Sequence, residues 1–175
     1  MPGLLLFVLA SWQTSLAQPN RSVYTSLDAK QCRTLKSDTS EASDYLGRCK
    51  GISGYSLLLA EGDLRQNLTV VTPSGTKHSL ELWNVISGGF SSLGANAEWR
   101  VTKQGKAFVP VALIVRFNAS EDSENSKKIT SYLAVSKITN TEICVTHKIG
   151  PGPQANDEAR RAADDAAKKP CLTSQ

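Results

Sequence analysis

Apolar and polar residues alternate with a period of two over much of the middle of the chain, which predicts β-strands. The alternation is cleanest around Trp99, which lies on an apolar face while Glu98 and Arg100 lie on the polar face. Shorter segments with strand character occupy residues 66–72 and 78–84. This periodicity favours a sheet over a helical bundle.

The longest apolar run, residues 107–118, is apolar on both faces of the expected strand. Such a strand belongs at the centre of a sheet, where both of its faces are covered. Pro110 has no N–H to give to the ladder, so we expect it at an edge or beside a bulge. Two further strands, at residues 129–139 and 142–150, complete the series.

Short turns separate these strands. Proline and glycine in residues 73–76 suit a tight reversal, residues 103–106 form a second turn, and the polar residues 119–128 form a solvated hairpin tip. No helical pattern interrupts the series. We therefore predict a mainly β fold, an antiparallel meander forming a curled sheet or small barrel, with one C-terminal α-helix packed on it.

That helix is expected at residues 156–169, which are almost entirely alanines and charges. Its alanines recur at helical spacing and form one stripe. Asn156 is the expected N-cap. Acid-before-base pairs four residues apart support the helix, namely Asp157–Arg161, Asp164–Lys168 and Asp165–Lys169. Because alanine buries little apolar area, we expect weak docking that needs a covalent tether.

The four cysteines, Cys32, Cys49, Cys144 and Cys171, indicate two disulfides in an oxidising compartment. Four cysteines allow three pairings. The expected lengths of the last strand and of the C-terminal helix favour one of them. A strand from Cys144 to residue 150 advances about 20 Å, and a helix of fourteen residues returns about 21 Å. This predicts the pair Cys144–Cys171 and leaves Cys32–Cys49.

The first residues predict a signal peptide over residues 1–17. A short apolar run at residues 4–10 precedes Ser15 and Ala17, the small residues expected at positions −3 and −1 of a cleavage site. The segment lacks the usual Lys or Arg before its apolar run. The polar residues 18–53 predict an irregular segment closed by a disulfide, with at most one short strand. Residues 54–175 complete the same domain as a β-domain with its helix.

The net charge is +4, and the basic residues are spread along the sequence with acids between them. Nucleic-acid binding would need a concentrated basic face with stacking aromatic residues, so the sequence does not predict it. No run approaches the roughly 18 apolar residues of a membrane-spanning helix. Export and the cysteines together predict a periplasmic or secreted protein.

No catalytic motif is recognisable, so we assign no catalytic residue, cofactor or metal. Cys144 and His147 are three residues apart on an expected strand, where their side chains point to opposite faces. Carboxylates such as Glu61, Asp63 and Glu98 leave a hydrolase as an alternative, provided that two of them converge.

The glycine-rich residues 87–99 predict a connection between strands, with a mobile binding loop as the alternative. Trp83, Phe90 and Trp99 are the candidate binding residues in or beside it. The chain also contains three Asn-x-Ser/Thr sequons, to which we assign no role, at Asn20, Asn67 and Asn118.

At "GYSLLLAEGDLRQNLTV", "AEWRV" and "NDEARRAADDAAKKPC" the chain resembles small exported proteins of Gram-negative bacteria that have no assigned activity. The similarity extends over residues 24–171, and the cysteine spacing and alanine-rich tail are its most specific features. The resemblance implies a periplasmic address and no catalytic or binding residue.

The leading hypothesis is a non-enzymatic, disulfide-stabilised β-domain that binds a protein or an envelope component, with an inhibitor as one concrete form. A carboxylate hydrolase of envelope or extracellular material and a purely structural envelope protein are the alternatives.

Overall fold

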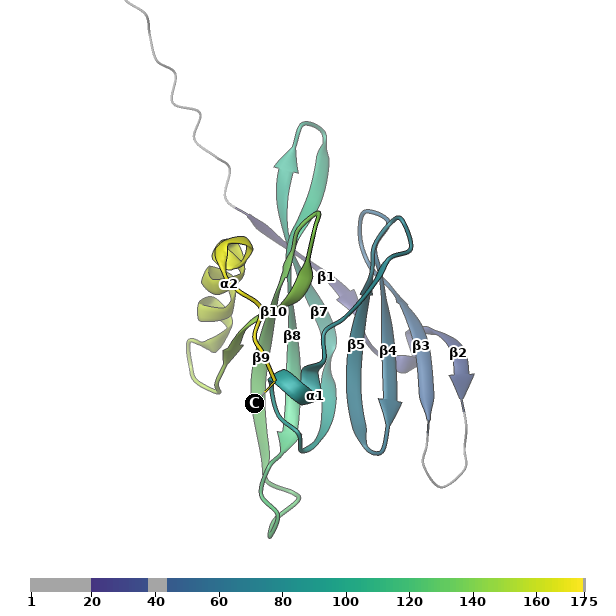
Figure 1. Cartoon of the computed structure of the whole chain (residues 1–175), viewed down its shortest axis with the longest axis vertical. Helices are drawn as coiled ribbons and strands as arrows, with labels where there is room; N and C mark the ends of the chain where they lie inside the picture. The colour runs from purple at the N-terminus through teal and green to yellow at the C-terminus, as the bar shows by residue number, and fades with distance from the viewer. Residues whose placement is uncertain (1–19, 38–43, 175) are drawn as a thin grey trace, which may run out of the picture.

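The computed structural model describes residues 20–37 and 44–174, and β-strands dominate it (Figure 1). All ten strands belong to one mostly antiparallel sheet, in the order β10-β9-β8-β7-β5-β4-β3-β2, with β1 paired to β7 and β6 paired to β5. The predicted fold class is confirmed. The sheet does not close into a barrel.

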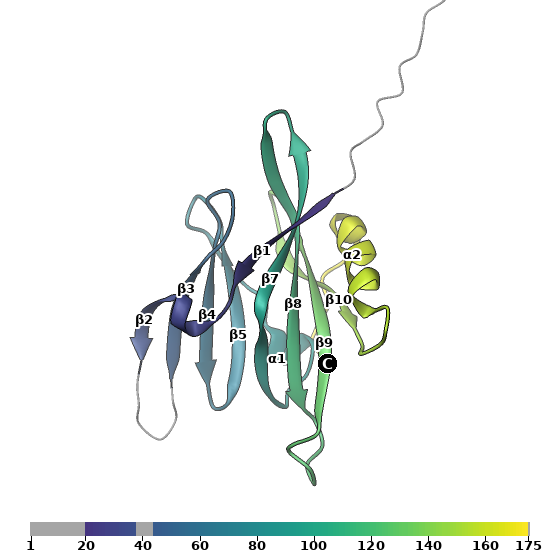
Figure 2. The ribbon, with the colours of Figure 1, turned by 180° about the vertical axis from the view of Figure 1, so that it is seen from behind.

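The sheet consists of two halves. The covered half, named for the helix on its outer face, contains β1 (Arg21–Ser26), β7 (Phe90–Gln104), β8 (Ala107–Ser120), β9 (Ile129–Ile138) and β10 (Ile143–Ile149). The bare half contains β2 (Arg33–Ser37), β3 (Tyr45–Lys50), β4 (Ser56–Gly62), β5 (Arg65–Val71) and β6 (Lys77–Ser79). A single parallel bridge between Arg65 and Ser91 joins the halves. Further along β7, β1 takes the free edge and runs diagonally across it (Figure 2).

The larger of two hydrophobic clusters in the described residues lies between the inner faces of the two halves, and the smaller one lies beneath α2. The bare half contributes the alternate residues of β4 and β5, and the covered half contributes those of β7 and β8. Trp99 is fully buried there and donates its indole N–H to Thr25 Oγ1 at 2.9 Å. The short helix α1 (Leu82–Val85) packs its apolar side chains into the same core.

β8 is the central strand of the covered half, as its two apolar faces predict. Leu113 and Val115 point into the core, whereas Ala112 and Ile114 point to the outer face beneath α2 (Ala155–Asp165). Pro110 pairs with β7 at a bulge, where the predicted irregularity occurs.

The N-terminal segment is more regular than the sequence predicts. Its described residues contain β1, β2 and β3, with the 3-10 turn η1 (Ala29–Gln31) between β1 and β2. The Cys32–Cys49 disulfide joins β3 to the start of β2, so this pairing is confirmed. The expected cleavage site after Ala17 lies outside the described residues.

The C-terminal helix is confirmed, but its first turn differs from the prediction. It begins at Ala155 with Gln154 in the N-cap position, so Asn156 is not the cap, and the turn η2 (Ala166–Lys168) extends it. The side chain of Asn156 instead accepts a hydrogen bond from Arg116 on β8 at 3.2 Å. Buried alanines face the sheet, with Ala159 and Ala166 fully enclosed.

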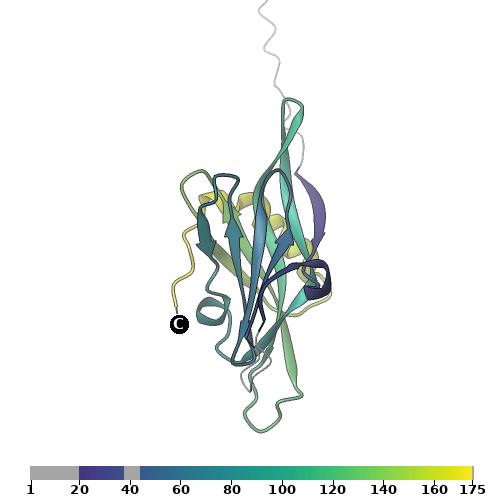
Figure 3. The ribbon, with the colours of Figure 1, turned by 90° about the vertical axis from the view of Figure 1, so that its right-hand side faces the viewer.

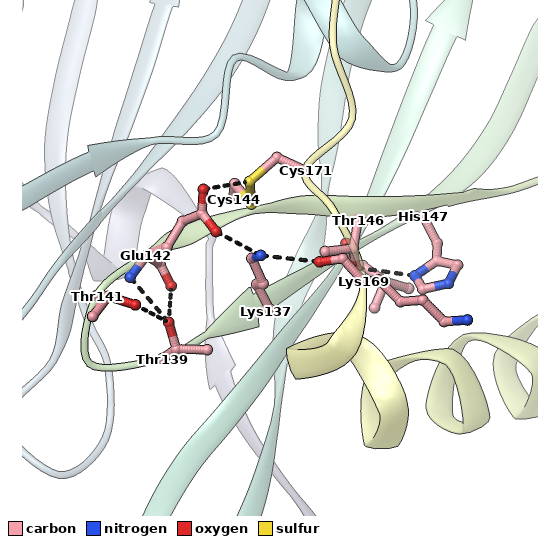
Figure 4. The surroundings of a disulfide bond; sticks show 10 residues. Lys137, Thr139, Thr141, Glu142, Cys144, Thr146, His147, Lys169 and Cys171 are labelled. Carbon is pink, nitrogen blue, oxygen red and sulfur yellow. Dashed lines mark hydrogen bonds and ion pairs between the residues drawn. A yellow bond between two sulfur atoms is a disulfide. The ribbon is translucent and has the colours of Figure 1, made fainter.

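The Cys144–Cys171 disulfide ties the end of this tail to β10, as predicted (Figure 4). Beside it, the buried Lys137 ammonium pairs with Glu142 at 2.6 Å and donates to the Lys169 carbonyl oxygen at 2.9 Å. The tail then runs along β10, and the Leu172 N–H donates to the Val145 carbonyl oxygen.

Charged side chains also hold the helix, which the sequence did not predict. Arg100 donates two hydrogen bonds of 2.9 Å to Asp164, and Glu98 accepts one of 2.8 Å from Arg160. Glu98 and Arg100 are therefore more than nine-tenths buried. The predicted pairs four residues apart are wrong, because Asp164 faces the sheet and the helix's own pairs are three residues apart, namely Asp157–Arg160 and Asp165–Lys168.

Candidate binding hollow at the α1–β7 end

The segment from α1 to the start of β7 lies in the lower part of the molecule in Figure 1, and it contains the exposed aromatic residues Trp83 and Phe90. Leu82, Val85 and Ile86 are buried and anchor α1 in the core. Because α1 is a single turn, residues between these anchors face outward, and Trp83 is 45% exposed. The buried side chains on either side of Trp83 thus hold the backbone of α1 in place, while the Trp83 indole lies at the surface.

Glycines place β7 close to the end of β8. A Cβ atom on Gly89 would collide with the carbonyl oxygen of Ser120, so the approach needs a glycine at this position. Phe90 follows, opposite Ser120, which is itself opposite Ile129 on β9. Phe90 and Ile129 therefore lie on the same face of the sheet, and both are about half exposed.

Arg65 is the central cation of this region. Its guanidinium lies 5.1 Å from the centroid of the Phe90 ring, donates to the Gly88 carbonyl oxygen at 3.0 Å and pairs with the Asp63 carboxylate. A cation over an aromatic face is attracted by the ring quadrupole. Arg65 consequently fixes both the glycine-rich segment and the phenyl ring.

The turn before Arg65 exposes a leucine. Asp63 and Leu64 connect β4 to β5, and both have positive φ angles, of 50° and 56°. Two-residue hairpin loops of this geometry usually use Asn-Gly or Asp-Gly, because a branched side chain is strained at positive φ. Leu64 nevertheless occupies the second position and is 59% exposed.

Two adjoining hollows flank the segment Ser87–Gly88, with Arg65 in the wall of both. One has a volume of about 510 Å³ and extends from Phe90 to Glu121 and Lys148. The other has a volume of about 530 Å³ and extends to Trp83. Together they form what we call the hollow.

A charged network forms the far wall of the hollow. The Tyr132 hydroxyl donates to Glu121 at 2.7 Å, and the Lys148 ammonium lies 4.3 Å from the Tyr132 ring centroid. Partial burial raises the pKa of Glu121, but hydrogen bonds, led by that from Tyr132, and the charge of Lys148 outweigh it. The pKa of Glu121 therefore lies below its usual value, whereas burial and this carboxylate raise the pKa of Tyr132.

The structure separates the three candidate binding residues. Trp83 and Phe90 line the hollow, whereas Trp99 is fully buried in the core. Sequence reasoning missed the other lining residues with exposed or charged side chains, notably Arg65 and Lys148, because they come from strands far apart in the chain. An apolar residue in the hairpin turn just before Arg65, Leu64, was a local signal of an unusual surface.

The carboxylates considered for a hydrolase are each bound to a different partner, and Glu98 lies away from the other two. Asp63 pairs with Arg65, and Glu61 accepts a hydrogen bond of 2.6 Å from Gln66. Glu98 lies on β7 beyond the Arg65–Ser91 bridge, and the β8 partners of Ser91 and Glu98 are five residues, or about 17 Å, apart along the sheet. It is enclosed beneath α2 and bound to Arg160.

Cys144, Cys171 and Glu142 are close enough to share a metal ion. Both sulfurs are bound in the disulfide, so this group offers one carboxylate and no thiolate. The side chains of the three sequon asparagines make internal hydrogen bonds, Asn20 to Asp164, Asn67 to Ser79 and Asn118 from Ser131. Within the described residues, no helix has the length and apolar character to cross a bilayer.

The chain matches no protein-family model, no curated protein and no solved structure at a significant level. The resemblance to exported Gram-negative proteins therefore stays a prediction, and any function has to be argued from the hollow itself.

Proposed function

We propose that this protein is an exported, non-enzymatic β-domain that binds another protein of the periplasm or cell exterior through the hollow. The observation that carries the proposal is the grouping of the exposed Trp83 and Phe90 with Arg65 in the walls of the hollow, next to the exposed Leu64 of the preceding turn. A protein that blocks an enzyme is one concrete form of this function.

The composition of this surface favours a protein partner. Protein interfaces are enriched in aromatic residues and arginine, and tryptophan and arginine dominate their hot spots. Eight large apolar side chains are exposed among the described residues, and four of them lie at this end, namely Leu64, Trp83, Phe90 and Ile129. A concentration of this kind on an otherwise polar surface is typical of interaction sites.

The fold supports a preorganised surface. α1 is anchored in the core by three buried side chains, and Arg65 fixes the loop and the Phe90 ring. Rigid presentation reduces the entropy lost on binding. The strained Leu64 fits the same interpretation, because backbone strain is often retained where a side chain must be displayed.

Two intramolecular disulfides support the predicted export, because such bonds persist in oxidising compartments. The hydrolase alternative has less support, because it needs two converging acids and Glu98 lies far from Glu61 and Asp63. A structural role in the envelope would leave the exposed side chains of the hollow unexplained.

Capture of proteins from a native envelope extract by the immobilised mature chain tests the proposal. We compare the wild type with a Trp83→Ala/Phe90→Ala variant and with Phe108→Ala. Phe108 is a matched control, since it is 40% exposed but lies near the β7–β8 turn. A hot-spot residue contributes at least about 2 kcal/mol, equivalent to roughly 30-fold in affinity.

We expect one or more proteins to be retained equally by the wild type and by Phe108→Ala, and lost from the double variant. Purified partner and a titration would then give the affinity ratio. Equal retention by all three chains, or retention of nothing at micromolar protein, would contradict a binding role for the hollow.

A further inference from the structure

The strand register gathers cations that are far apart in the sequence onto the outer face of the bare half. Arg48 and Lys50 flank Cys49, which points into the core, so both point outward. Arg33 lies directly opposite Arg48, and Lys36 lies opposite Leu46. Lys77 ends the row that passes from Lys50 through Ser56 and Val71. We call these five residues the basic face: Arg33, Lys36, Arg48, Lys50 and Lys77.

All five side chains are exposed, and few carboxylates neutralise their positive charges. Among residues 20–37 and 44–174, the one carboxylate paired with any of them is Asp44, at 3.4 Å from Lys36. Five cations and one carboxylate give an excess of four charges, as large as the net charge of the entire chain. The apparent scatter of basic residues in the sequence is therefore misleading.

The arrangement is not explained by folding. Like charges directly opposite one another on adjacent strands destabilise a sheet, and Arg33 and Arg48 are such a pair. Cations on an edge strand can prevent edge-to-edge aggregation, which would account for Arg33 and Lys36 on β2. Arg48 lies on β3 between two paired strands, where no edge needs protection, and Lys50 follows it on β3 beyond the last residue that pairs with β2.

The face is also accessible. α2 packs on the opposite half, and α1 packs on the inner side of the sheet. In Figure 3 the strands of the bare half lie toward the viewer and α2 lies behind them. The residues that lie opposite Arg48 and Lys50 on β4 and β5 are small or aliphatic. The cations therefore dominate the chemistry of this surface.

We propose that the basic face binds the phosphate groups of an anionic phospholipid bilayer. The cations are distributed over an area that extends from β2 to β6, roughly 19 Å across the strands. None of them lines either part of the hollow. A two-dimensional distribution on a pleated surface matches a plane of phosphates, whereas a single polymer strand would need a groove.

The side chains of this face distinguish a bilayer from a nucleic acid. Single-stranded nucleic acids are held by aromatic platforms as well as cations, and none of the residues in these rows is aromatic. Each cation near an anionic surface contributes about 1 kcal/mol, so several together give measurable binding.

Sedimentation with vesicles tests the proposal on the mature protein. The probes are vesicles of phosphatidylglycerol mixed with phosphatidylcholine and vesicles of phosphatidylcholine alone. The test variant is Arg33→Glu/Lys77→Glu, and the matched control is Lys103→Glu/Lys106→Glu, which changes the net charge equally at the exposed β7–β8 turn. We expect the wild type and the control to bind the anionic vesicles at low salt, and the test variant to bind at least about tenfold more weakly.

Equal loss in the control would show that net charge alone is responsible and would overturn the proposal. Tighter binding to soluble polyglutamate or single-stranded DNA than to vesicles would overturn the choice of a bilayer. If the charge-reversed variant does not fold, Arg33→Gln/Lys77→Gln provides the same comparison with a smaller change. The Trp83→Ala/Phe90→Ala variant should bind vesicles normally, because this surface is independent of the hollow.

Discussion

The outer faces of the two halves use charge in opposite ways. On the covered half, Glu98 and Arg100 are enclosed beneath α2 and each is paired with a charge on the helix. On the bare half, Arg33 and Arg48 lie opposite each other at the surface. Glu98 and Arg100 on β7 and Arg48 on β3 all alternate with residues that point into the core, so the pattern alone does not separate them. The difference is whether another element brings the opposite charge.

This comparison also explains how an alanine-rich helix can dock. Alanines let α2 approach the sheet closely, but they remove little apolar area from water. The Arg100–Asp164 and Glu98–Arg160 pairs add charge-assisted hydrogen bonds, and the Glu98 bond helps raise the pKa of Arg160. The disulfide at the end of the tail supplies the third contribution.

Removing that disulfide should have the largest effect on the covered half. In the chain-entropy description, the 27-residue separation of Cys144 and Cys171 corresponds to about 3–4 kcal/mol. We expect Cys144→Ala/Cys171→Ala to lower the free energy of unfolding by about that amount in urea titrations. Limited proteolysis should then cut between residues 150 and 170.

The matched control is Cys32→Ala/Cys49→Ala, which removes the bridge within the bare half. Its proteolytic cuts should fall near β2 and leave α2 intact. Cleavage of α2 in both variants would show that the helix depends on global stability and not on its own tether.

Replacing one arginine on each half tests whether paired and unpaired charges contribute differently to stability. Arg100→Ala removes the cation paired with Asp164, leaves Asn20 as the remaining donor to that carboxylate and creates a cavity beneath the helix, so we expect a loss of about 3 kcal/mol. Arg48→Ala, the same substitution on the bare half, should change the free energy of unfolding by less than about 1 kcal/mol. Equal effects in urea titrations would mean that the buried pairs do not hold the helix.

Much of the fold could be predicted from the sequence, because the core strands carry strong local signals. Trp99 and the double apolar face of β8 identified the core and the central strand. β2 was not predicted, since all five of its side chains are exposed and it has no apolar face to reveal a period. The burial of Glu98 and Arg100 was missed because their partners lie more than sixty residues away.

The hollow and the basic face were harder to predict because their residues are brought together from distant parts of the sequence. Trp83 and Phe90 could be nominated as aromatic residues beside a glycine-rich segment. Arg65 and Lys148 join them only through the arrangement of the strands, and Arg33 meets Arg48 only through the register of β2 and β3. The sequence determines the strand order and register that create these contacts, but no local pattern of residues reveals them.

Relief of repulsion on the bare half should give a smaller effect of opposite sign. Arg33→Thr removes one member of the Arg33–Arg48 pair and introduces a residue that favours strands. We expect the free energy of unfolding to rise by about 0.5 kcal/mol at low ionic strength, and the gain to shrink as salt is added. A loss of stability would mean that Arg33 makes a favourable structural contact.

The smallest expected effect concerns His147 on β10, in the covered half. Burial and the nearby Lys169 lower the pKa of its imidazole below the usual value. The unfolded chain therefore binds a proton more readily than the folded chain, and the stability that His147 contributes above about pH 6.5 is lost as the pH falls. Thermal unfolding between about pH 7.5 and 5.5 should show a smaller fall in Tm for His147→Gln than for the wild type. If the variant and the wild type show the same fall in Tm, the pH dependence comes from other groups, and the tail of the covered half is not responsible for it.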